Sequence, residues 1–220
     1  MAAGYPVYMA VRESEELRGL SRSEALRASP RMFENEWLDR LSRVHPAVPP
    51  ILFGPGVVFL IVWGVIQGAG WWSFAWVAGG YAFWTLAEYW IHRVIFHFEP
   101  ERGIGARIHW IIHGVHHDHP NDPLRLVMPP SVSVPLGALF VLGFYAVLGS
   151  PAFLPFAAGF LGGYLLYDMI HYHLHHHRPN TAVGRWLREL HMRHHFQDHE
   201  RGYGISAPYW DYIFRTPLKR

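Results

Sequence analysis

Two long stretches without a charged residue dominate the hydrophobic pattern of the chain. Residues 46–87 and residues 126–167 each run for 42 positions with no Asp, Glu, Lys, Arg or His. A helix needs about 20 apolar residues to cross a bilayer, so each stretch can supply two crossings. Gly-Ala-Gly at 68–70 and Gly-Ser-Pro at 149–151 are typical turn residues. The pattern predicts an all-α integral membrane protein whose four transmembrane helices form two hairpins, at about 51–68, 72–92, 131–149 and 151–170.

The polar remainder of the chain fixes the expected orientation. All 19 Lys and Arg and all 17 His lie outside the uncharged stretches. An even number of crossings puts these residues on one side, which the positive-inside rule makes cytoplasmic. We therefore expect a cytoplasmic helical cap, in the bacterial inner membrane or the endoplasmic reticulum.

The first 45 residues differ from the rest in their mixed charge, with Arg12 and Glu13 among many charged side chains. Within them, the segment 33–41 places apolar side chains on one helical face, which is typical of an amphipathic helix. This helix lies either on the membrane surface or against its own protein. We expect 1–45 to be a polar arm with an interfacial helix, and 46–220 to be the membrane domain.

Composition narrows the chemistry. Half of the residues are hydrophobic and only 16% are charged, which suits a membrane protein. The absence of cysteine excludes disulfides, thiolate metal sites and iron–sulfur clusters. A net charge of +2, with no basic stripe, does not indicate a nucleic-acid partner.

Histidines are the candidate functional residues, because they recur at ligand spacing beside the ends of the predicted helices. Residues three or four apart share one helical face, so their imidazoles can point at a common ion. Imidazole is a usual ligand of iron and zinc, and five per ion would suit two ions. The predicted dimetal site consists of His92, His97, His113, His116, His117, His171, His175, His191, His194 and His195.

One pair in this set is less regularly spaced than the others. His92 and His97 are five residues apart and diverge by about 140° on an ideal helix. They fit only if the helix unwinds there or if each serves a different ion.

Six further histidines suit a surface or supporting role better, although the position of His109 leaves it possible as a ligand. These six are His109, His119, His173, His176, His177 and His199.

Two acids precede histidine clusters at the ends of the return helices. Glu88 comes four residues before His92, and Asp168 comes three before His171. Ten neutral imidazoles leave about four positive charges of two divalent ions uncompensated, so nearby carboxylates are expected to hydrogen-bond the outer ring nitrogens. The alternative for each acid is an interfacial cap or ion pair.

The clusters resemble those of the membrane fatty acid hydroxylase superfamily, over roughly residues 33–216. The matching strings are EYWIHRVIFH at 88–97, HGVHH at 113–117, YDMIHY at 167–172 and HMRHH at 191–195. The string PNDPLRLVMPP at 120–130 is similar to the fatty acid 2-hydroxylase branch in particular. In that family the metal ligands fall on the ten histidines named above.

The resemblance implies a di-iron centre that uses O₂ to hydroxylate C2 of an acyl chain of a fatty acid or sphingolipid. It also implies substrate-binding roles for Asp122, Arg125 and Tyr172. Zinc is expected in the purified protein, because imidazole sites bind it more tightly than ferrous iron. The first 45 residues lack the haem motif of a fused b-type cytochrome, so we expect a separate electron-transfer protein such as a b-type cytochrome or a ferredoxin.

Two alternatives remain open at this point. The same centre could hydroxylate or desaturate a sterol or a carotenoid. A metal transporter is a more distant alternative, because transport favours ligands near the bilayer midplane and the uncharged stretches contain no histidine.

Overall fold

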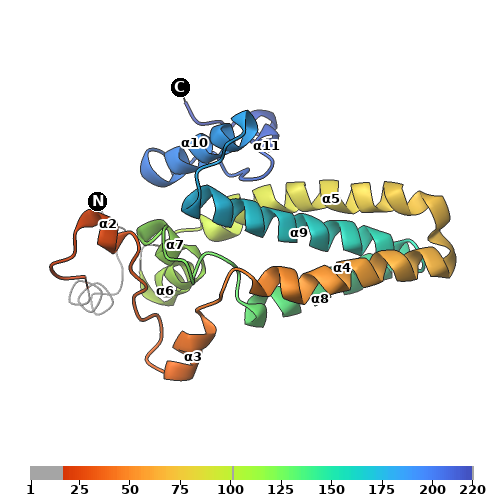
Figure 1. Ribbon diagram of the computed structural model, residues 1–220, viewed down its shortest axis with the longest axis horizontal. Helices are drawn as coiled ribbons and strands as arrows, with labels where there is room; N and C mark the ends of the chain where they lie inside the picture. Colours follow the sequence, from red (N-terminus) through yellow and green to blue (C-terminus); the bar gives the residue numbers. More distant parts are fainter. Residues whose placement is uncertain (1–16, 101, 220) are drawn as a thin grey trace.

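The computed structural model describes residues 17–100 and 102–219, and this part of the chain is built from helices without a strand. Four long helices lie side by side, and shorter helices form a cap at one end of them (Figure 1). The all-helical class is therefore confirmed. The first 16 residues of the expected polar arm lie outside the described residues.

The first hairpin consists of α4 (Val48–Gly64) and α5 (Ser73–Trp90). A π-helical turn, η1 (Val65–Ala69), and a 3₁₀ turn, η2 (Gly70–Trp72), join them. Gly68 has a φ of +98°, a left-handed conformation that costs glycine little because it has no Cβ. The chain therefore reverses at the predicted Gly-Ala-Gly turn, and α5 runs back in the opposite direction to α4, with α9 between the two (Figure 1).

The second hairpin consists of α8 (Pro130–Leu148) and α9 (Phe153–His176). Three segments are long and apolar enough to cross a membrane: Val48–Phe96, Pro130–Leu148 and Phe153–His176. The first of these contains both helices of the first hairpin. The four long helices agree with the expected spans to within a few residues at most ends, although α9 runs on to carry the third histidine cluster into the cap.

Helix α9 is the central helix and packs closely against α5. Gly159 of α9 faces the backbone of Val77, and a Cβ at this glycine would lie 2.0 Å from the Val77 carbonyl oxygen. Gly80 of α5 faces Phe156 in the same way, at 1.9 Å. Small residues at such crossings let helix backbones approach, which is the usual packing mode of membrane helices.

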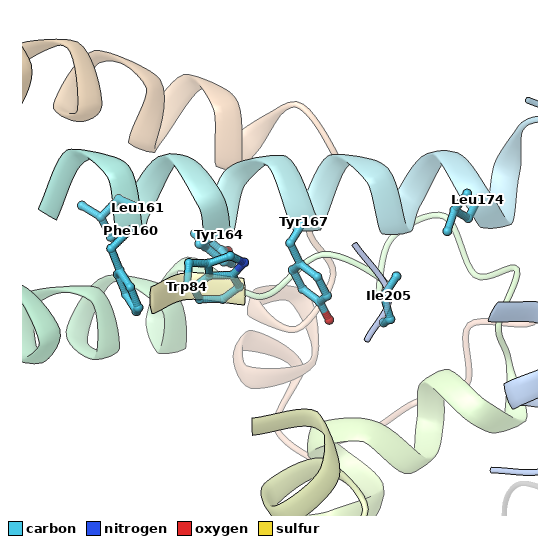
Figure 2. Close-up of a cluster of buried hydrophobic side chains, with 7 residues drawn as sticks. All are labelled: Trp84, Phe160, Leu161, Tyr164, Tyr167, Leu174 and Ile205. Atoms are coloured by element: carbon cyan, nitrogen blue, oxygen red, sulfur yellow. The ribbon is translucent and has the colours of Figure 1, made fainter. Parts of the chain in front are cut away.

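The hydrophobic core follows one side of α9 toward the cap (Figure 2). Trp84 of α5 packs edge-on against Phe160 and Tyr164, with ring centroids 5.2 and 5.4 Å away. At the cap end the same cluster includes Leu174 and Ile205, the latter from the C-terminal segment. One core therefore joins the bundle to the cap.

The cap combines three regions of sequence. After α5 the chain forms a π-helical turn, η3 (Ile91–Phe96), and then α6 (Gly103–His109), a second π-helical turn η4 (Trp110–Gly114) and α7 (Val115–Asp118). After α9 it forms α10 (Ala182–Phe196) and α11 (Tyr209–Ile213). The N-terminal segment adds α2 (Arg22–Ala25) and α3 (Glu36–Leu41) at the same end (Figure 1).

Candidate metal centre

The structure brings all ten of the selected histidines together at the cap end of the bundle. They form two groups of five, and within each group one nitrogen per residue lies within 4.8 Å of all the others. The first group is His92, His97, His113, His117 and His194; the second is His116, His171, His175, His191 and His195. Histidines more than 100 residues apart in sequence therefore share one site.

In the first group the Nε2 atoms converge. His92 Nε2 lies 3.2 Å from the Nε2 atoms of both His97 and His113, and His97 Nε2 lies 3.1 Å from that of His194. His117 Nε2 lies 3.0 Å from His113 Nε2. Two ligands at right angles around an ion, each about 2.1 Å from it, would be about 3.0 Å apart. The spacing therefore fits a metal ion among these nitrogens.

A π-helical turn brings His92 and His97 into the same group. In η3 the N–H of His97 donates to the carbonyl of His92 at 3.1 Å, which closes a turn of five residues. In such a turn, positions i and i+5 lie above one another instead of diverging. The local unwinding that the sequence required is therefore present, and both residues face one site.

The second group is built mainly on α9 and α10. His171 and His175 are one turn apart on α9, and His191 and His195 are one turn apart on α10. His191 Nε2 lies 2.7 Å from His175 Nε2 and 3.1 Å from His195 Nε2. The fifth member, His116, comes from α7, and its buried Nε2 has no hydrogen-bond partner in the described part of the chain.

The two groups are direct neighbours. His116 and His117 belong to different groups although they are adjacent in sequence, and so do His194 and His195. The rings of His117 and His195 stack with centroids 4.3 Å apart across the boundary. This arrangement can hold two ions side by side.

Burial keeps these imidazoles neutral at pH 7. It lowers the pKa of His97 to about 2, of His116 to about 3 and of His194 to about 4, helped in the first two by neighbouring histidines. Neutral imidazole is the form that binds metals. The histidines of the centre are therefore neutral before a metal binds, and binding does not have to displace the proton of an imidazolium ion.

Backbone carbonyls of the C-terminal segment hold two outer nitrogens of the first group. His92 Nδ1 lies 2.7 Å from the carbonyl oxygen of Tyr203, and His194 Nδ1 lies 2.7 Å from that of Arg201. A carbonyl can only accept, so each Nδ1 carries the proton and each Nε2 presents a lone pair. Several lone pairs at about 3 Å repel one another unless a cation lies between them.

Two residues that contact the histidine groups were not selected from the sequence. The first is Tyr203, whose carbonyl oxygen lies 2.7 Å from His92 Nδ1 and which lies in a tail that contains no candidate ligand. Glu99 was not selected either, yet its carboxylate lies 3.3 Å from His97 Nδ1, and His109 and His199 lie at 4.0 and 3.9 Å from it. Its position two residues after His97 was the one available signal.

The carboxylates of Glu88 and Asp168 do not contact an imidazole among the described residues. Glu88 is buried and accepts hydrogen bonds from the Ser206 N–H, at 2.7 Å, and from the Ser206 hydroxyl. Asp168 accepts one from the Tyr164 hydroxyl at 3.2 Å. The expected direct bond to an outer ring nitrogen is thus replaced by an indirect one: Glu88 holds the segment that carries the Tyr203 carbonyl.

The residues assigned to substrate binding lie along the loop after α7 and on α9. Arg125 is buried and donates to Asp39 at 3.0 Å and to the carbonyl of Pro30. A contact between its guanidinium and a substrate would require these bonds to break. Tyr172 is partly buried beside Val127, with its ring 4.3 Å from that of His176.

The six histidines given a surface or supporting role lie outside both groups of five, and so does His45. His119 Nδ1 lies 2.6 Å from the carbonyl of Ala25 and so joins the cap to the N-terminal segment. His173 and His177 stack on each other on the exposed side of α9. The division between ten converging and six peripheral histidines therefore follows the one made from spacing.

Fold and site together define an apolar helical protein with a histidine-lined centre that could hold metal. Comparison with known proteins narrows this class. The family model described as fatty acid hydroxylase matches residues 77–216. The chain is 36% identical over 193 residues to the dihydroceramide fatty acyl 2-hydroxylase FAH2 of Arabidopsis thaliana, covering 85% of this chain and 79% of that protein.

Other relatives agree. The ceramide very long chain fatty acid hydroxylase SCS7 of Saccharomyces cerevisiae is 41% identical over 61% of this chain and 36% of its own length. A solved structure of full-length Scs7p, in which only the hydroxylase domain is visible, superposes with a TM-score of 0.79 at 28% identity, over 99% of this chain and 95% of that one. This chain belongs to the fatty acid hydroxylase family. It is accordingly a hydroxylase, an enzyme of the oxidoreductase class.

Proposed function

We propose that the protein is a membrane-bound, O₂-dependent 2-hydroxylase of fatty acids or of sphingolipid N-acyl chains, working through a di-iron centre held by the ten histidines. The observation that carries this proposal is the convergence of one ring nitrogen from each of ten histidines in two adjoining groups of five. The relatives supply the substrate class, since they are named as 2-hydroxylases of dihydroceramide acyl chains or of fatty acids.

The donor set suits iron. Iron, when bound, supplies the redox chemistry needed to break an unactivated C–H bond, which zinc cannot do. The protein's own residues present neutral imidazoles, exclude water by burying them, and fix the tautomers of His92 and His194 through main-chain carbonyls. Glu88 supports this arrangement through Ser206, in the segment that carries the Tyr203 carbonyl. A supporting role for Asp168 and a substrate-binding role for Asp122, Arg125 and Tyr172 stay predictions.

The proposed membrane arrangement follows the hairpins. Helices α4, α5, α8 and α9 cross the bilayer, and the cap with both groups of histidines lies on the cytoplasmic side. Exposed apolar side chains along α4 and α8, such as Phe59 at 60% and Leu139 at 66%, suit contact with lipid tails. Residues 1–45 then form an arm on the cytoplasmic side of the membrane domain 46–220, and electrons come from a separate cytochrome or ferredoxin.

Lipid analysis of a host without 2-hydroxy lipids tests this function. Cells expressing the protein should gain 2-hydroxy acyl chains, and cells expressing His113→Ala should not, because that variant removes one ligand of the first group. The matched control is His173→Ala, an exposed histidine outside both groups, which should keep the product. A new double bond in a sterol or carotenoid, or an unchanged product in His113→Ala, would contradict the proposal.

A further inference from the structure

Helix α3 has its polar and apolar sides reversed relative to a helix on a water-soluble surface. Of its two acidic residues, Glu36 is exposed but Asp39 is only 8% exposed, whereas Trp37 is 72%, Leu38 is 50% and Leu41 is 58% exposed. At about 100° per residue, the three apolar residues fall within one arc and Asp39 lies opposite them. In water the usual pattern turns the apolar face inward. The exposed face of α3 therefore suits an apolar surrounding.

The helix is fixed in this orientation. The carboxylate of Asp39 accepts hydrogen bonds from the Met32 N–H at 2.7 Å and from the guanidinium of Arg125 at 3.0 Å. It also forms an ion pair with Arg43 at 3.0 Å. Arg125 belongs to the loop that follows α7, so α3 is bound to the cap through its polar side. Its apolar side is held outward by these bonds.

The apolar face continues onto neighbouring elements. Arg107 of α6 lines a shallow hollow together with Phe33 and Leu38. Ile104 and Ile108, on either side of Arg107 in sequence, are 80% and 49% exposed. Helix α6, which shares this hollow with the α3 region, therefore also exposes apolar side chains.

The connection to α4 places this surface at the membrane. Helix α3 ends at Leu41 and α4 begins at Val48, so the six residues between them can span roughly 20 Å at most. Ile51, in the first turn of α4, is 72% exposed and lies on the proposed lipid-facing surface. Figure 1 shows α3 beside the cap end of α4.

We propose that α3 docks on the cytoplasmic surface of the lipid bilayer and anchors the cap there. Trp37 is a residue type that membrane interfaces favour, and the guanidinium of Arg40 lies 5.7 Å from its ring centroid, where it can meet lipid phosphates. The bilayer fits this face better than a second copy or a soluble partner, because the face is continuous with α4. The proposal rests on the membrane arrangement proposed above.

Docking would also set the height of the metal centre above the bilayer. Arg125, the partner of Asp39, lies eight residues after His117 in the same cap segment. The N–H of Val44 donates to the Leu124 carbonyl at 2.6 Å, which adds a second link between the α3 region and this segment. The membrane contact of α3 is therefore joined to the histidines of α7 through rigid contacts.

Fluorescence quenching by brominated lipids tests the docking. The chain has no cysteine, so Leu38→Cys and Leu41→Cys each provide a single labelling site. A fluorophore there should lose its emission in vesicles of lipids brominated near the headgroup end of the acyl chain. The matched control is Glu36→Cys, on the polar side of the same helix, which should keep its emission.

A label at Leu139→Cys on α8 separates this proposal from the membrane arrangement. Quenching at Leu139 without quenching at Leu38 or Leu41 would overturn docking while the crossings stand. Leu139 lies midway along α8, so its label is read in lipids brominated near the far end of the acyl chain. Equal emission from Leu139→Cys in these and in ordinary lipid would refute the crossings themselves. If the emission of the Leu38 label also falls in ordinary lipid, and falls further as the protein density in the vesicles rises, the face contacts a second copy of the chain and docking on the bilayer is overturned.

Discussion

At the scale of single residues, the first group of histidines depends on main-chain atoms of a segment that carries no ligand. The carbonyls of Tyr203 and Arg201 fix the tautomers of His92 and His194. A main-chain carbonyl cannot be removed by substituting a side chain. Its position depends on the hydrogen bonds that hold the loop in place. Asp211 does this, because the N–H groups of Tyr203 and Gly204 both donate to its carboxylate at 2.9 Å.

Replacing Asp211 with Asn should therefore weaken metal binding by the first group. The amide retains one acceptor where the carboxylate had two, so at least one N–H loses its partner and the loop shifts. Loss of such a supporting bond typically lowers metal affinity roughly 10- to 100-fold. The measurement is metal content against chelator concentration, with loss of about one ion per chain in Asp211→Asn at a chelator level that the wild type withstands.

Glu200→Gln is the control for this variant, since Glu200 is an exposed acid in the same segment. Equal retention of metal by all three proteins would show that the C-terminal carbonyls do not support the site. Loss of both ions together in Asp211→Asn would point instead to general unfolding of the cap.

The residues of the centre were predictable to different degrees for a physical reason. Ligand histidines leave a pattern in sequence because helix geometry fixes their spacing, and all ten selected residues lie in the two groups. Main-chain acceptors such as the Tyr203 carbonyl leave none, since any residue type can supply them. Glu88 shows the intermediate case, in which the position near the site was apparent but its partner, Ser206, lies 118 residues further along the chain.

At the scale of elements, α5 and α9 pack closely together, and the turn after α5 carries His92 of the first group while α9 carries His171 and His175 of the second. A methyl group at Gly159 would lie 2.0 Å from the Val77 carbonyl oxygen. This neighbour is a backbone atom, which cannot move aside as the end of a flexible side chain can. Gly159→Ala should destabilise the protein by about 1–3 kcal/mol, as overpacking usually does. The thermal unfolding midpoint in detergent measures this.

Gly143→Ala on α8 provides the comparison, because a Cβ at Gly143 meets nothing within 4 Å. Alanine should be neutral or slightly stabilising there, given its better helix propensity. A midpoint for Gly159→Ala equal to that of Gly143→Ala would mean that the two helices separate without cost.

The attachment of α3 to the cap should depend on pH. Burial alone would raise the pKa of Asp39, but the Met32 N–H and the cations Arg43 and Arg125 outweigh it and hold the pKa below its usual value. A carboxyl whose pKa falls on folding stabilises the folded state above its unfolded pKa, near 4, and this contribution is lost as pH falls through the folded pKa. Acid should therefore release the segment 17–45.

Hydrogen–deuterium exchange in 17–45, corrected for its intrinsic pH dependence, measures this release. Asp39→Asn should give fast exchange already at neutral pH, because it removes the buried carboxylate that pairs with Arg125 at 3.0 Å, at a cost of about 3 kcal/mol. Glu36→Gln, exposed on the same helix, should behave as wild type. Acid-induced exchange that persists in Asp39→Asn with the wild-type midpoint would assign the transition to another group.

At the scale of the whole molecule, length and charge were enough to predict four long helices in two hairpins. They did not show which helix is central, because the hydropathy of α8 and α9 indicates only that both are apolar. In the structure 61% of the most apolar part of α9 is buried, against 6% for α8. The distinguishing feature is the run of small residues at Gly159, Gly162 and Gly163, which hydropathy does not weigh and which lets α9 pack against its neighbours.

The same whole-molecule arrangement predicts which metal is found and which one works. Ten neutral, preassembled imidazoles select ions by affinity, and imidazole sites bind zinc more tightly than ferrous iron. The purified protein should therefore contain about two zinc ions per chain and be inactive, because zinc has no redox chemistry. Removing zinc and loading ferrous iron under anaerobic conditions should restore formation of 2-hydroxy acyl product in proportion to iron content, measured on the same samples with an electron donor present. Activity that follows zinc content instead would exclude iron as the working metal, whereas the two groups of five histidines would still account for the binding of two ions.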